Sequence, residues 1–235
     1  ANMNKAHRDR IAFMRVVSGR FDADREVYHV QGGKKIKLSR PQQLMAAERE
    51  IIEEAYAGDI IGVFDPGIFS IGDTLCAPGK KFRFDPIPTF APEHFRRVRP
   101  LDTMKRKQFL KGMEQIAQEG AIQIFKTPYT GMEEVIVGVV GTLQFDVLEY
   151  RLKNEYGVEL YMEGLPYEYL RWIENDTGEP IKEEQLILGT DVKLVEDYKG
   201  NQLLLFASQW SIHWVQDKNK DLTLTEFGGA RDSQG

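Results

Sequence analysis

The chain of 235 residues is 42% hydrophobic and carries a formal net charge of −5 at pH 7. It is long enough for one large domain or two small ones with apolar cores, and no apolar run approaches the ~20 residues of a membrane span. The acidic balance argues against general affinity for nucleic acid. The single cysteine, Cys76, excludes an internal disulfide and fits the reducing cytoplasm.

The first 85 residues are expected to form an all-β domain, because short apolar and β-branched runs alternate with turn residues. Strands are predicted at residues 10–17, 27–30, 35–38, 60–63 and 68–71. The pair Gly32-Gly33 marks a hairpin turn between the second and third of these strands. Many short strands of this kind indicate a small β-barrel.

The segment 42–56 is open to two interpretations. Its content of Ala, Glu, Gln and Met suits a helix, whereas the flanking Pro41 and Gly58 and the pair Ile51-Ile52 suit strands of a barrel. We favour strands, because the flanking residues bracket the segment on both sides.

The stretch of residues 80–92 is predicted to be an extended connector, because it alternates prolines with phenylalanines that can pin it to its neighbours. The residues of both types are Phe82, Phe84, Pro86, Pro88, Phe90 and Pro92. The domain boundary is placed in this stretch, with a barrel at residues 1–85 and a second domain at residues 86–235.

The second domain is predicted to contain six elements in the order β-α-β-β-α-β, at residues 95–99, 103–119, 121–125, 134–140, 143–156 and 158–162. Asp102 can cap the first helix, and Gly120 suits the position after its end. In the second helix, Glu149 and Lys153 are spaced to form an ion pair. This order is the split βαβ core of ferredoxin-like α+β domains.

A C-terminal α/β extension is expected after this core. Strands are predicted at residues 167–173, 192–195, 202–207 and 222–225, with a helix at residues 210–216.

The sequence contains no pattern that predicts a catalytic, cofactor-binding or metal-binding centre. The four histidines lack the spacing of metal ligands and are interpreted as surface or boundary residues. The run from Gly72 to Lys80 resembles a phosphate-binding loop, but six residues separate Gly72 from Gly79, and Lys81 stands where Ser or Thr is required. We therefore expect the chain itself not to be an enzyme.

Clusters of basic residues are the more informative feature. Between Glu93 and Lys111, seven basic and two acidic residues give a local charge of +5. Basic side chains on or beside turns can contact a phosphate backbone without reading sequence, although a solvated helix face is the alternative interpretation. The candidates for contact with RNA are Arg15, Arg20, Lys34, Lys35, Lys37, Arg40, Arg96, Arg97, Arg99, Lys105 and Arg106.

Several motifs resemble a known family. Residues 11–21 (IAFMRVVSGRF) are similar to the opening strand of the second domain of translational GTPases, and residues 57–61 and 71–75 resemble the paired Gly-Asp motifs of that barrel. Residues 141–147 (GTLQFDV) depart from the Gly-Glu-Leu-His-Leu run of elongation factor G, and residues 90–97 (FAPEHFRR) are a second distinctive run. Both resemble the peptide chain release factor 3 family, and the likeness spans roughly residues 5–173.

The resemblance implies a GTPase that binds the ribosome after peptide release and displaces the class I release factor. It implies that this chain corresponds to the second and third domains, with GTP and Mg bound in a GTP-binding domain that is missing here. The partners would be small-subunit ribosomal RNA and protein and the protein's own GTP-binding domain, with no membrane involved. Two alternatives remain: another elongation factor G-like GTPase, and a metabolic module that binds a ligand on its ferredoxin-like sheet.

Overall fold

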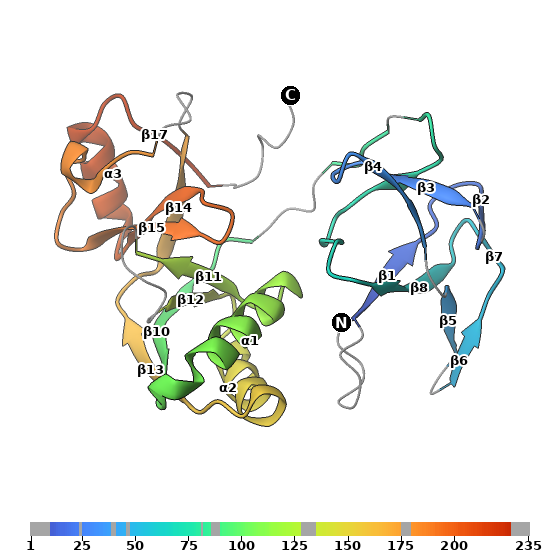
Figure 1. The fold of residues 1–235 in the computed structure, drawn as a ribbon. Helices are drawn as coiled ribbons and strands as arrows, with labels where there is room; N and C mark the ends of the chain where they lie inside the picture. Colours follow the sequence, from blue (N-terminus) through green and yellow to red (C-terminus); the bar gives the residue numbers. More distant parts are fainter. Residues whose placement is uncertain are drawn as a thin grey trace. The chain divides into compact units, whose positions relative to one another are not determined.

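The computed structural model describes residues 10–23, 25–38, 41–45, 48–80, 82–85, 90–127, 135–174 and 180–226. The chain divides into two compact units, Ala1–Ile87 (unit 1) and Pro88–Gly235 (unit 2). Both are shown in Figure 1, and each is described separately below.

Unit 1 contains only strands in its described residues. They are β1 (Arg10–Arg15), β2 (Arg20–Asp22), β3 (Glu26–His29), β4 (Lys34–Lys37), β5 (Gln42–Met45), β6 (Glu48–Ile51), β7 (Glu54–Tyr56), β8 (Ile60–Asp65) and β9 (Leu75–Cys76). Three antiparallel sheets result, ordered β1-β8-β5-β6, β2-β7 and β4-β3-β9. Among the described strands, these hydrogen-bonded ladders do not close into one barrel.

Side chains from all three sheets nevertheless share one apolar core. Ile61 and Val63 of β8 are buried in it with Ala55 of β7, and Phe21 of β2 and Leu75 of β9 pack against them. The expected preference for strands over residues 42–56 is confirmed, because β5, β6 and β7 occupy this segment.

The strand predicted at residues 68–71 is wrong. Asp65 ends β8, and its Oδ1 atom accepts hydrogen bonds from the backbone N–H groups of Gly67, Ile68 and Phe69 at 2.8, 2.9 and 3.3 Å. These bonds hold the chain in a turn, so the N–H groups that a strand would offer to a neighbour are already used.

Unit 2 combines eight strands with three α-helices in its described residues. The strands are β10 (His94–Pro100), β11 (Gln123–Lys126), β12 (Val135–Val139), β13 (Leu160–Leu165), β14 (Tyr169–Glu174), β15 (Val192–Asp197), β16 (Gln202–Phe206) and β17 (Thr223–Thr225). The helices are α1 (Arg106–Gln118), α2 (Leu143–Tyr156) and α3 (Gln209–Lys218), with 3-10 turns η1 (Thr103–Lys105) and η2 (Glu183–Gln185). One antiparallel sheet has the order β13-β10-β12-β11-β15-β16-β14-β17.

Helices α1 and α2 cover one face of β13, β10, β12 and β11 (Figure 1). The apolar side chains of α1 recur at helical spacing, and those of α2 do likewise, so both helices bury a stripe. Phe109, Met113, Phe145 and Leu148 are fully buried against Val98 of the sheet. The predicted cap is found one turn earlier than α1: the Asp102 carboxylate caps η1, which leads into the helix, by accepting a hydrogen bond from the Met104 N–H at 2.9 Å. Helix α1 itself follows Lys105, which forms no side-chain cap.

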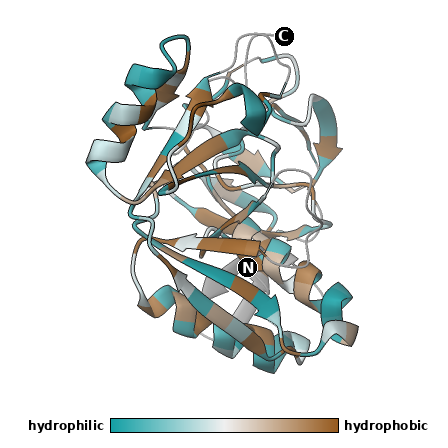
Figure 2. Ribbon diagram, turned by 90° about the vertical axis from the view of Figure 1, so that its left-hand side faces the viewer, coloured by the Kyte–Doolittle hydropathy of each residue, from teal (hydrophilic) through white to brown (hydrophobic). Residues whose placement is uncertain are grey.

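The opposite face of these strands packs against the second half of the sheet. Phe95, Phe125 and Ile136 meet Leu170 and Leu203 in a second core. This packing requires the sheet to turn back on itself, and the two halves join at β11 and β15 through only two residue pairs. Helix α3 covers the remaining face over a third core, and Figure 2 shows hydrophobic residues concentrated along the strands between these layers.

The predicted strands and helix of the C-terminal extension are confirmed as β14, β15, β16, α3 and β17, with small shifts in their ends. No helix within the described ranges is long and apolar enough to cross a membrane.

Candidate nucleic-acid interface

The hairpin of β3 and β4 presents lysines in unit 1. Lys34, Lys35 and Lys37 are exposed, whereas Ile36 between them packs into the core. Neither Lys34 nor Lys35 forms an ion pair with another described residue. These two side chains are therefore cations that face solvent beside a tight Gly-Gly turn.

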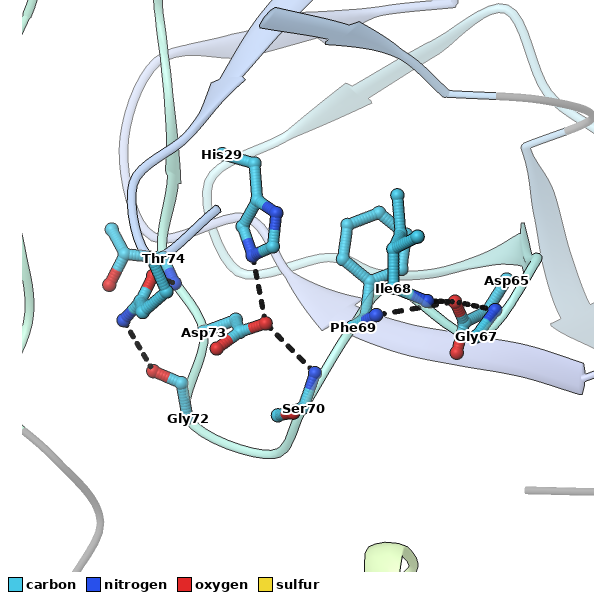
Figure 3. Close-up of polar contacts among 10 residues, drawn as sticks. His29, Asp65, Gly67, Ile68, Phe69, Ser70, Gly72, Asp73 and Thr74 are labelled. Atoms are coloured by element: carbon cyan, nitrogen blue, oxygen red, sulfur yellow. Dashed lines mark hydrogen bonds and ion pairs between the residues drawn. The ribbon is translucent and has the colours of Figure 1, made fainter. Parts of the chain in front are cut away.

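This hairpin is fixed to a distant loop by a buried histidine (Figure 3). The Nε2 atom of His29 lies 2.8 Å from Oδ2 of Asp73, and the same carboxylate oxygen accepts a hydrogen bond from the Ser70 N–H at 2.8 Å. Thr74 N–H donates to Oε1 of Gln31 at 2.8 Å. The Gly-Asp motif at residues 72–73 thus anchors the loop to the turn end of the hairpin.

The interpretation of His29 as a surface or boundary residue was wrong, because only 3% of this residue is exposed. Gly32 explains part of this burial, since a Cβ atom at that position would collide with the imidazole ring. The proximity of Gly32-Gly33 to His29 in the sequence was a signal of this close packing, but the partner Asp73 lies too far along the chain to be found from spacing.

Arg15 and Arg20 differ in whether neighbouring carboxylates compete for their guanidinium groups. Arg15 is exposed at the end of β1, opposite Ile60. Arg20 forms ion pairs with Asp22 at 2.9 Å and with Glu54 at 3.6 Å, and these carboxylates, Asp22 first, raise the pKa of the Arg20 guanidinium. A phosphate would have to compete with both carboxylates for Arg20. Arg40 lies outside the described residues.

The three arginines of β10 do not form one patch. Successive side chains of a strand point to opposite faces. The Arg96 guanidinium lies 4.3 Å from the centre of the Phe145 ring on the face that α2 covers. On the other face, Arg97 pairs with Glu163 at 3.2 Å, and Arg99 stacks on Tyr161 at 4.6 Å.

Lys105 and Arg106 stand at the start of α1, where both are exposed. The Nζ atom of Lys105 donates a hydrogen bond to the carbonyl of Gly157 at 2.5 Å. Gly157 ends α2 with a φ of +66°, so Lys105 places a cation at the negative end of that helix. The local charge of +5 is therefore spread over two faces of the sheet and two helix ends.

The side chain of Gln144 forms its hydrogen bonds with backbone groups. Gln144 belongs to the run that departs from elongation factor G. Its Oε1 atom accepts hydrogen bonds from the N–H groups of Val140 and Gly141, both at 3.0 Å. Its Nε2 atom donates to the Ala121 carbonyl at 2.7 Å. The side chain thus ties the start of α2 to the segment before β11.

A shallow pocket of about 360 Å³ lies where β10, α2 and β13 meet. Its walls carry the carboxylates Glu93 and Glu168 as well as Arg96, so the charges do not converge on one kind of ligand. In the described part of the chain, no group of three or more His, Cys, Asp or Glu residues is placed to hold a metal ion. The carboxylates Glu93 and Glu168 in the pocket wall would repel the phosphates of GTP.

A family model described as "Class II release factor RF3, C-terminal domain" matches residues 84–216. The chain belongs to this release factor family. A model described as "Elongation factor G domain 2" matches residues 1–78. The predicted resemblance to the release factor 3 family is confirmed.

Relatives of the same name cover nearly the whole chain. Peptide chain release factor 3 of Symbiobacterium thermophilum is 52% identical over 98% of this chain and 43% of its own length. The proteins of that name from Gloeobacter violaceus and Listeria monocytogenes are 44% and 46% identical over 97% of this chain and 42% of their lengths. The chain thus spans less than half the length of these relatives.

A crystal structure of a Thermus thermophilus protein resembles the fold, with a TM-score of 0.54 and 17% identity over 72% of this chain and 27% of that one. At this identity, the likeness concerns the fold alone.

Proposed function

We propose that this chain is the ribosome-binding part of a release factor 3 protein, and that the complete protein is a cytoplasmic GTPase that promotes dissociation of class I release factors after peptide release. The observation that carries the proposal is the family match over residues 84–216, joined to 44–52% identity with relatives named peptide chain release factor 3. In this proposal GTP and Mg belong to a GTP-binding domain outside this chain.

The folds of the two units support this assignment. We propose that unit 1 is a translation-factor β-barrel whose ladders are not closed in the described strands; the single core that its three short sheets share supports this. Unit 2 corresponds to a ferredoxin-like domain with an extension, because β10, α1, β11, β12, α2 and β13 follow one another and their strands lie in the order β13-β10-β12-β11. The boundary between the two domains is proposed at residues 85–86.

The chain's own role is to dock. Lys34, Lys35 and Arg15 are exposed cations on strands of unit 1, and they contact phosphates of small-subunit ribosomal RNA in this proposal. The His29–Asp73 contact keeps the lysine hairpin in a fixed place, which lowers the entropy lost on binding. Arg97, Lys105 and the remaining candidates of unit 2 are secondary contacts, because most of them already have protein partners.

In this proposal each unit is a docking element and not a catalyst. GTP binding in the neighbouring domain changes how the docked units are held, since an interface between domains can adopt discrete arrangements. The consequence on the ribosome is displacement of the class I release factor, which this chain assists without a chemical step.

Co-sedimentation of the chain with 70S ribosomes across a salt series tests the proposal. Contact with roughly four to six phosphates predicts that affinity falls by about two to three decades between about 50 and 200 mM salt. Absence of pelleting at low salt would overturn docking by this chain. Any GTP hydrolysis above buffer would contradict the assignment of GTPase activity to another domain.

A further inference from the structure

The pocket where β10, α2 and β13 meet is lined by charged side chains that form no ion pair among the described residues. The side chains of Glu93, Arg96 and Glu168 also form no hydrogen bond with another described residue. Other charged residues of the same strands are paired, as Arg97 is with Glu163 at 3.2 Å. Unpaired charges of both signs therefore surround one hollow of about 360 Å³.

Arg96 presents a guanidinium group to this pocket. The group lies 4.3 Å from the centre of the buried Phe145 ring, and this stacking limits its orientation. Arginine binds a carboxylate through two parallel N–H groups. Thr142, the residue before α2, also lines the pocket, so the positive end of that helix lies at the same wall. This part of the pocket suits a carboxylate.

The other charged residues of the walls are negative. Glu93 comes directly before β10 and Glu168 comes directly before β14, so the two carboxylates belong to different segments. With His94 neutral, two carboxylates against the one guanidinium of Arg96 leave one excess negative charge. The walls therefore match a ligand that carries two cationic groups and one anionic group.

The charged neighbours of the walls do not reverse this sign. The charges that act on Tyr167 in the wall are those of Arg97 and Asp191. Arg97 is offset by Glu163 on the face of β10 and β13 away from Arg96. Asp191 is negative, and so is Asp146 in the first turn of α2. A ligand that is an anion overall is therefore disfavoured.

We propose that this pocket binds a free basic amino acid, of which L-lysine is the simplest example. Its carboxylate pairs with Arg96 and its two ammonium groups pair with Glu93 and Glu168, so each charge meets an opposite one. The aliphatic stem lies on Leu165 and Pro166, as lysine stems do on apolar surface. The volume is at the small end of the range for ligand pockets, which agrees with a ligand of this size. The inference does not depend on ribosome docking.

The test is a titration of the isotope-labelled chain with L-lysine, followed by NMR. Shifts of backbone amides are expected within residues 93–96 and 164–168. No shifts in these segments at about 10 mM L-lysine, where even a millimolar site is mostly occupied, would overturn the proposal.

Three analogues each remove one charge from the ligand. Cadaverine lacks the carboxylate, norleucine lacks the side-chain ammonium group, and Nα-acetyl-lysine has no charged α-amino group. Each should bind about tenfold or more weakly than L-lysine, because hydrogen bonds between charged groups are the strong ones. Equal affinity for any of the three would overturn the recognition of both kinds of charge.

Variants of the walls identify the residues that bind. Glu168→Gln and Arg96→Gln should each weaken L-lysine about fivefold or more. Cadaverine should bind Arg96→Gln no more weakly than the unmodified chain, because it has no carboxylate to lose. Glu114→Gln is the matched control, since Glu114 is an exposed carboxylate of α1 without an ion pair among the described residues. An equal loss in Glu114→Gln would show attraction to total charge and would overturn the site.

Gly164 offers a variant that fills the pocket without changing a charge. It pairs with Arg96 across β13 and β10, so a side chain at position 164 would lie beside Arg96 on the same face. A Cβ atom there meets nothing within 4 Å, so the fold should be retained. Gly164→Val should abolish the shifts caused by L-lysine and leave amide signals away from the pocket in place. Unchanged affinity for L-lysine in Gly164→Val would place the binding elsewhere and overturn the inference.

Discussion

His29 and Asp73 are 44 residues apart in the sequence, yet Nε2 of the one lies 2.8 Å from Oδ2 of the other. The contact joins β3 to the loop before β9, and the Phe69 ring packs edge-on against the imidazole with ring centres 5.4 Å apart. It is one of several polar links between the Gly-Asp motif at residues 72–73 and the lysine hairpin of β3 and β4.

Replacing Asp73 should loosen this part of unit 1. Asp73→Ala removes the acceptor for the buried His29 ring and for the Ser70 N–H, and we expect a loss of about 2–3 kcal/mol of unfolding free energy. The loss of stability is measured by the faster hydrogen exchange of the backbone amides of β3 and β9. Asp85→Ala is the control, because Asp85 is exposed and has no hydrogen bond or ion pair among the described residues. Unchanged protection in Asp73→Ala would contradict the structural role of the pair.

Gly112 in α1 is a second position where a small change should be costly. A Cβ atom there would stand 2.5 Å from Cδ2 of Leu152 and 3.0 Å from the Tyr156 ring. Alanine favours a helix over glycine by about 1 kcal/mol, but overpacking costs typically 1–3 kcal/mol, so Gly112→Ala should be neutral to destabilising by about 2 kcal/mol.

The measurement for Gly112→Ala is unfolding in urea followed by tryptophan fluorescence, since Trp172, Trp210 and Trp214 all lie in unit 2. Gly141→Ala is the matched control, because a Cβ at Gly141 has no neighbour within 4 Å. A gain in stability from Gly112→Ala would show that α1 and α2 pack less closely than described.

The ion pair between Lys153 and Glu159 should be visible in a titration. The hydrogen bond and charge of Lys153 lower the pKa of Glu159 below its ordinary value of 4.5. The pair therefore stabilises the fold above about pH 4.5, and this contribution is lost as the pH falls through the pKa of the folded state.

Lys153→Met should raise the pKa of Glu159 toward its ordinary value in a carboxyl NMR titration. Lys111→Met, an exposed lysine of α1 without an ion pair among the described residues, should leave it unchanged. The same pKa in both variants would exclude Lys153 as the cause.

The lysine hairpin provides the prediction on ribosome binding. Lys34→Gln with Lys35→Gln should lower affinity for 70S ribosomes and reduce the slope of log affinity against log salt by about 0.7–0.9 per lost phosphate contact. Lys218→Gln with Lys220→Gln removes the same charge from exposed positions of unit 2. Equal slopes for the two double variants would show that only total charge matters and would remove the hairpin from the interface.

The sequence predicted best what depends on local periodicity. The helix expected at residues 143–156 is found at Leu143–Tyr156, because buried residues recur every three or four positions and Gly157 ends it with a positive φ. Residues 68–71 were misassigned because Asp65, a single upstream carboxylate, takes the backbone bonds of the next turn.

Side-chain pairing was harder to predict because competing partners come from elsewhere in the fold. Glu149 and Lys153 have the spacing of an ion pair, yet Lys153 pairs with Glu159. Likewise, seven basic residues close in sequence gave one predicted cluster, but the alternation of β10 sends Arg96 to one face and Arg97 to the other. Net charge along a segment predicts a surface only when the geometry of its element is considered too.

The bend of the large sheet at β11 and β15 has a practical consequence for dissecting the protein. A shortened version of unit 2 that stopped after β13 would retain both helices and their core, but it would uncover Phe95, Phe125 and Ile136 on the reverse side. An exposed hydrophobic surface of this kind promotes aggregation. The last third of the chain therefore covers a second hydrophobic core, and unit 2 cannot be shortened by removing it.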